Sequence, residues 1–72
     1  MEETLRQVFV RVFNDMNIDN TISRENFELW DSINHISLMV EIESEFKIEL
    51  EPEEFQNMMD FISILNNIKN KL

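Results

Sequence analysis

The sequence contains no glycine and no cysteine, and Pro52 is its only proline. Because tight hairpin turns depend on glycine and proline, their scarcity argues against a β-rich fold and predicts an all-α chain. Without cysteine no disulfide can stabilise the fold, so packed helices must do so alone. The absence of cysteine also fits a reducing compartment.

Positive charge is scarce as well: six Lys and Arg residues stand against fifteen Asp and Glu, a net charge of −9. Nucleic acids and anionic membranes are bound through Lys and Arg, so we expect no nucleic-acid partner and instead expect partners with basic surfaces. No apolar run approaches the ~20 residues that span a bilayer, and the N-terminus lacks the pattern of a signal peptide. We therefore expect no membrane insertion and a cytoplasmic location.

The length of 72 residues suits one small domain, which we expect to span residues 1–72. A chain this short has no room for a second core or for a catalytic cleft walled by its own structure, so we expect a protein that is not an enzyme. Met1 and the short ends favour a free-standing protein.

Apolar spacing predicts the helices. A first helix over residues 2–17 is indicated by one stripe: Leu5, Val8, Phe9, Val12, Phe13 and Met16. A second helix begins after Asp31 with the buried stripe Ile36, Met39, Ile42 and Phe46. Pro52 opens a short third helix that ends near Met58, because proline is tolerated in a first turn. Asp60 caps a last helix with the apolar side Phe61, Ile64, Leu65 and Ile68.

Residues 18–30 lose the helical period and are rich in Asn, Asp, Thr and Ser, which predicts a long loop. Four apolar residues should anchor it: Ile22, Phe27, Leu29 and Trp30. The expected fold is therefore a small four-helix bundle with three main helices, one short helix and a long loop between helices one and two.

The segment Trp30-Asp31-Ser32-Ile33-Asn34-His35-Ile36 and the acidic stretch 41–48 resemble the acyl and peptidyl carrier proteins. In that family an Asp-Ser-Leu triplet opens the second helix and an acidic stretch ending in Phe follows, and the resemblance extends through essentially the whole chain. The matching serine there carries 4′-phosphopantetheine donated by coenzyme A. The resemblance implies that Ser32 is the attachment site and that Asp31 helps the modifying transferase to hold Mg²⁺ or orient the serine, with Mg²⁺ needed only in that complex.

The resemblance also implies a function without chemistry of its own. Acyl groups would be held as thioesters on the arm's thiol and passed among partner enzymes. Those partners would be a phosphopantetheinyl transferase, an acyl-loading ligase or acyltransferase, and a downstream synthase or transferase. We expect the carrier itself to be a monomer.

The same resemblance implies a partner-binding face made of Ile33, Val40, Glu41, Glu43 and Glu45. Partner Arg and Lys side chains would recognise the carboxylates and speed encounter more than they tighten the complex. A run of acidic residues is also typical of a merely solvated helix face, and Ile33 and Val40 fit a core position equally well.

Some residues depart from the commonest fatty-acid carrier pattern. Trp30 precedes the Asp-Ser pair, Ile33 replaces leucine, Ser37 stands where an acid is frequent, and Lys47 interrupts the acidic run. These departures favour a specialised biosynthetic pathway over housekeeping fatty-acid synthesis.

His35 has no Ser, Cys or carboxylate at the spacing of a catalytic triad, so we expect a surface histidine that tunes docking near neutral pH. Phe55, Met58 and Met59 are candidates to line an acyl pocket, because methionine adapts its shape easily. Ordinary core packing explains these three residues as well.

Two other functions fit parts of the sequence. Asp15, Asn17 and Asp19 occupy the first, third and fifth places of an EF-hand calcium loop, but Asn20 stands where glycine makes the turn and Asn26 where a bidentate Glu is required. The second alternative is a small helical adaptor with no cofactor, in which Ser32→Ala is tolerated.

Overall fold

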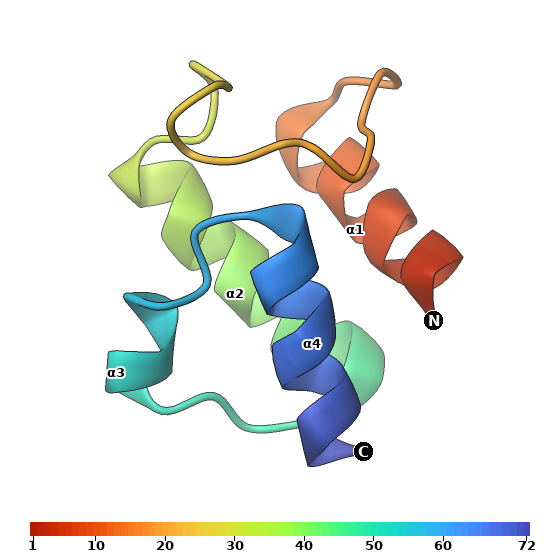
Figure 1. The fold of residues 1–72 in the computed structure, drawn as a ribbon, viewed down its shortest axis with the longest axis vertical. Helices are drawn as coiled ribbons and strands as arrows, with labels where there is room; N and C mark the ends of the chain where they lie inside the picture. The colour runs from red at the N-terminus through yellow and green to blue at the C-terminus, as the bar shows by residue number, and fades with distance from the viewer.

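The computed structural model describes all 72 residues and contains four helices and no β-strand (Figure 1). The helices are α1 (Glu2–Phe13), α2 (Ser32–Phe46), α3 (Pro52–Phe55) and α4 (Phe61–Lys71). The all-α prediction is confirmed. None of the four helices combines the length and the apolar character needed to cross a bilayer.

Two aspartates begin the helices that the sequence assigns to them. The Asp31 carboxylate accepts the backbone N–H of Asn34 at 2.8 Å at the start of α2. The Asp60 carboxylate accepts the backbone N–H of Ser63 at 2.7 Å at the start of α4. Each bond satisfies one of the free N–H groups of a first turn, so both predicted caps are confirmed.

The first helix is shorter than predicted. Asn14 takes a left-handed backbone conformation (φ 52°, ψ 44°) and ends α1 at Phe13, a conformation that asparagine adopts more easily than most residues. Met16 therefore lies outside the helix and is 85% exposed. The predicted extension to residue 17, with Met16 on the buried stripe, is wrong.

α3 is a single turn rather than a helix reaching Met58. Pro52 is its first residue, and Glu51 and Glu54 form a reciprocal capping box, in which Glu51 N–H donates to the Glu54 carboxylate at 2.7 Å. Glu54 also pairs with Lys71 at 2.9 Å, which ties the last turn of α4 to α3.

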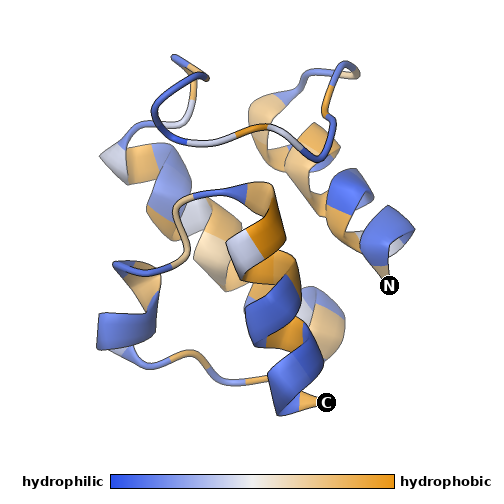
Figure 2. Cartoon of the chain, in the orientation of Figure 1, coloured by the Kyte–Doolittle hydropathy of each residue, from blue (hydrophilic) through white to orange (hydrophobic).

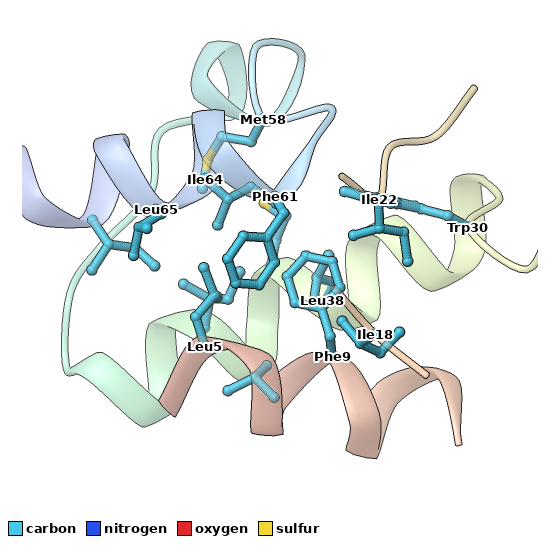
Figure 3. Close-up of a cluster of buried hydrophobic side chains, with 14 of the residues drawn as sticks. Leu5, Phe9, Ile18, Ile22, Trp30, Leu38, Met58, Phe61, Ile64 and Leu65 are labelled. Atoms are coloured by element: carbon cyan, nitrogen blue, oxygen red, sulfur yellow. The ribbon is translucent and has the colours of Figure 1, made fainter. Parts of the chain in front are cut away.

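The core is built from α1, α2, α4, the long loop and the connections on either side of α3, and many of its apolar side chains meet in Figure 3. Phe9 lies at its centre, with ring centroids of Trp30 and Phe61 at 5.3 and 5.2 Å. Apolar residues lie along the three long helices, while much of the long loop is hydrophilic (Figure 2). All four predicted core residues of the last helix are buried: Phe61, Ile64, Leu65 and Ile68.

The buried side of α2 differs from the predicted one. His35, Leu38, Met39 and Ile42 face the interior, whereas Ile36 is 58% exposed. The prediction is therefore right for Met39 and Ile42 and wrong for Ile36, and Phe46 is only half-buried.

The long loop packs onto the helices. Ile22 and Trp30 are buried as predicted and Phe27 is half-buried, but Leu29 is 48% exposed and is not an anchor. The buried Ile18 is an anchor that the sequence did not indicate.

One stretch of the loop runs beside the connection between α3 and α4. Arg24 N–H donates to the Met59 carbonyl at 2.9 Å, and Phe61 N–H donates to the Ile22 carbonyl at 3.0 Å. This pairing fixes the backbone of Arg24 close to the start of α2.

Candidate functional site

Ser32 is the first residue of α2 and is exposed, in the position that the sequence predicts. The Asp31 carboxylate before it is held by the Asn34 backbone N–H, and the Asn34 side chain donates to the Leu29 carbonyl at 2.7 Å. These bonds fix the path of the chain into the helix. Ser32 is thus exposed at a turn that these hydrogen bonds hold in place.

Arg24 contacts this hydroxyl. One terminal nitrogen of its guanidinium, Nη2, donates to Ser32 Oγ at 3.3 Å, and Nε donates to the Trp30 carbonyl at 3.4 Å. The other terminal nitrogen lies 3.7 Å from Met59 Sδ. The sequence gives no sign of this role for Arg24, because a single basic residue in a polar loop belongs to no motif and only the pairing of the loop brings it to Ser32.

An open pocket of about 310 Å³ adjoins Ser32 between the long loop, α2 and α3. Arg24 lies on its wall, and Ile36, Phe55 and Met59 supply its apolar surface. Two of the three residues predicted to line an acyl pocket therefore do line a pocket. The third, Met58, is fully buried in the core instead.

His35 is buried, so its predicted surface position is wrong. Trp30 Nε1–H donates to His35 Nδ1 at 2.9 Å. Because indole nitrogen can only donate, Nδ1 carries no proton, and Nε2–H must donate to the Phe55 carbonyl at 2.8 Å. The neutral imidazole thus joins the loop, α2 and α3 behind Ser32.

Burial lowers the pKa of His35 below its usual 6.5, and the charge of Arg24 adds to this, although the Phe55 carbonyl opposes it. The imidazole of His35 therefore binds a proton more readily in the unfolded chain than in the folded one. The contribution of His35 to folding stability is fully present above pH 6.5 and is lost as the pH falls below that value. We expect a loss of at most about 1.4 kcal/mol per pH unit.

Chemical denaturation at several values between pH 7.5 and pH 5.5 measures this loss. The variant His35→Gln lacks the titrating ring and is the control, since its stability should change much less over the same range. Parallel curves for the two proteins would show that His35 titrates normally.

Two predicted partner-binding positions, Ile33 and Val40, lie at the surface of α2 together with Ile36, which was predicted to be buried. Ile33 is 77% exposed and Val40 55%, and Ile36 at 58% lies on the same helix face because positions three and seven residues apart point the same way. The three side chains form an exposed apolar stripe, which we call the α2 stripe. The core alternative for Ile33 and Val40 is thereby wrong.

The predicted acidic residues of α2 have different environments. Glu41 and Glu45 are exposed and share Arg11 of α1, at 3.7 and 3.1 Å. Glu43 is half-buried, and its carboxylate accepts the Leu50 backbone N–H at 2.9 Å. Glu43 therefore fastens the connection after α2, while Glu41 and Glu45 remain accessible.

The carboxylates of the calcium alternative form hydrogen bonds within the loop. The Asp15 carboxylate accepts the Asn17 backbone N–H at 2.8 Å, and the Asp19 carboxylate accepts both the N–H and the hydroxyl of Thr21. These bonds stabilise local turns within the loop. The structure brings no three His, Cys, Asp or Glu side chains together in a group that could hold a metal ion.

Comparisons with known proteins leave the site to be interpreted from its own geometry. Scans against protein-family models, curated proteins and solved structures each find no significant match to this chain.

Proposed function

We propose that this chain is an acyl carrier protein, which holds acyl groups as thioesters on a 4′-phosphopantetheine arm at Ser32 and presents them to partner enzymes. The observation that supports this most is the exposed Ser32 hydroxyl at the head of α2, directly after the capping Asp31. The order of the helices and the long first connection also support the proposal.

The residues around Ser32 fit the proposed group. In the modification, Ser32 Oγ bonds to the phosphorus next to pantetheine in coenzyme A, the bond from that phosphorus to adenosine 3′,5′-bisphosphate breaks, and the hydroxyl proton passes to a base. The resulting phosphodiester would lie near the N–H groups of the first turn of α2 and the positive end of its dipole. The Asp31 carboxylate, whose charge opposes the phosphate, is engaged by Asn34.

The arm would supply a thiol, which the chain itself lacks. The remaining tasks fall to residues of the chain: Ser32 anchors the arm, and α2 carries the surface that partners recognise. We assign that surface to Ile33 and Val40 of the α2 stripe together with Glu41 and Glu45. Its partners would be the transferase, an acyl-loading enzyme and a downstream synthase or transferase of a specialised cytoplasmic pathway.

The absence of cysteine gives a simple test of this proposal. After incubation with coenzyme A, Mg²⁺ and a broad-specificity phosphopantetheinyl transferase, followed by removal of free coenzyme A, a thiol reagent should titrate one thiol per chain. The untreated protein should give none. A cofactor-free adaptor predicts no thiol after treatment, and this result would exclude the carrier function.

The acidic part of this surface leads to a second expectation. We expect Glu41→Gln combined with Glu45→Gln to slow modification by the transferase about three- to tenfold at low salt, because charge attraction raises association rates. High salt should remove most of the difference, since exposed charges are then screened.

Glu2→Gln combined with Glu3→Gln is the matched control. These two residues also share one arginine, Arg6, but they lie on α1. Circular dichroism should show that both variants keep the helical content. Equal slowing by the two pairs would mean that net charge matters and the location on α2 does not.

A further inference from the structure

We propose that Arg24 binds the phosphodiester of the arm on Ser32 and so fixes the direction in which the arm leaves the protein, along the pocket between the long loop, α2 and α3. This inference rests on the proposed function. It assigns a role to a loop residue outside the Asp-Ser segment.

The first observation is that Arg24 has no carboxylate partner in a very acidic chain. Arg6 and Arg11 each form ion pairs with glutamates, whereas Arg24 forms none. Arg24 is also half-buried, where the attraction between a guanidinium and a counter-ion is stronger than in open solvent. With fifteen acidic residues in the chain, an arginine that forms an ion pair with none of them is suited to an anion that arrives later.

The second observation is the position of the guanidinium. Its Nη2 lies 3.3 Å from Ser32 Oγ, the atom that would bond to phosphorus. The phosphate oxygens would be one bond further from Oγ than phosphorus, which leaves them within reach of the same guanidinium. Arginine presents several N–H donors in a planar fork and binds phosphate strongly through two parallel hydrogen bonds.

The third observation is that Arg24 is already fixed in place. Its backbone N–H bonds to the Met59 carbonyl at 2.9 Å, and its Nε bonds to the Trp30 carbonyl at 3.4 Å. The Arg24 side chain would therefore lose little conformational entropy when it binds the phosphate. Arg24 and Met59 also line the pocket beside Ser32, so a phosphate held by Arg24 starts the arm at the pocket rim.

The test compares the melting temperature of modified and unmodified protein. The phosphodiester adds negative charge to a chain that already carries −9, and Arg24 should offset the repulsion. We expect the change in melting temperature on modification to be about 3 °C less favourable in Arg24→Gln than in the wild type, the size expected for one partly exposed ion pair.

Arg11→Gln is the matched control, because it removes the same charge from α1, where Arg11 pairs with Glu41 and Glu45 on the later part of α2. The change in the melting temperature of Arg11→Gln on modification should equal that of the wild type. Mass spectrometry first establishes that each protein carries the arm.

A second measurement needs no variant. In the wild type, the side-chain Nε–H signal of Arg24 in a ¹H–¹⁵N spectrum should shift, and its exchange with water should slow, when the arm is attached. If the wild type accepts no arm, the proposed function itself fails. If the arm is attached but the Arg24 signal stays in place and Arg24→Gln behaves like Arg11→Gln, the inference about Arg24 is wrong while the carrier function stands.

Discussion

Ser32→Ala is expected to abolish the attachment of phosphopantetheine completely, so that the treated variant contains no titratable thiol. The variant loses the only atom that can bond to phosphorus at the head of α2 and should keep the fold, because Ser32 is exposed and the helix is capped by Asp31. Thiol titration and intact mass measure the effect, with circular dichroism as the check on folding.

Ser37→Ala is the matched control for this prediction. Ser37 is also an exposed serine of α2, but it lies within the helix, away from its first turn. It should accept one arm as the wild type does. Retained modification in Ser32→Ala would move the attachment site elsewhere and remove the basis for the proposed role of Arg24.

Phe9→Ala is expected to have the largest effect on stability, about 3–5 kcal/mol, because it removes a fully buried ring and leaves a cavity. Phe9 packs against Phe13, Trp30 and Phe61 and so joins α1 to the loop and α4. A domain of 72 residues has a total stability of about 4–11 kcal/mol, so the variant should be largely unfolded or melt at least ~15 °C lower.

Met16→Ala is the informative control, because the apolar spacing of the sequence places Met16 and Phe9 on the same stripe. The structure leaves Met16 85% exposed, so this variant should change stability by less than about 0.5 kcal/mol. Denaturant unfolding of both variants measures the difference. A large loss of stability for Met16→Ala would indicate that α1 extends through residue 17 and that its end at Phe13 is wrong.

Local chemistry was sufficient to predict several parts of the fold. Asp31 and Asp60 cap their helices through bonds to N–H groups only three residues away, so the sequence carries the whole signal. The apolar side of α4 was also predictable, because Phe61, Ile64, Leu65 and Ile68 form one stripe and polar residues fill most of the other positions.

The buried face of α2 could not be predicted in the same way. The helix carries the exposed α2 stripe on one side and Leu38, Met39 and Ile42 on the other, so its pattern fits more than one buried face. Packing against the rest of the chain decides which side faces the core.

Parts of the site depend on contacts between different elements of the fold. His35 can be buried only because the loop supplies Trp30 and α3 supplies the Phe55 carbonyl as hydrogen-bond partners. Arg24 reaches Ser32 only because the loop pairs with the connection before α4. Neither arrangement leaves a local pattern, whereas the Asp-Ser pair at the start of a predicted helix does.

The most direct test of the central claim is peptide-level mass spectrometry of the wild-type protein after treatment with coenzyme A, Mg²⁺ and the transferase. The carrier function predicts that the intact chain gains one phosphopantetheine and that fragmentation places all of it on Ser32. An unchanged mass, or an arm on any other residue, would contradict the proposal that the hydroxyl at the head of α2 is the covalent anchor.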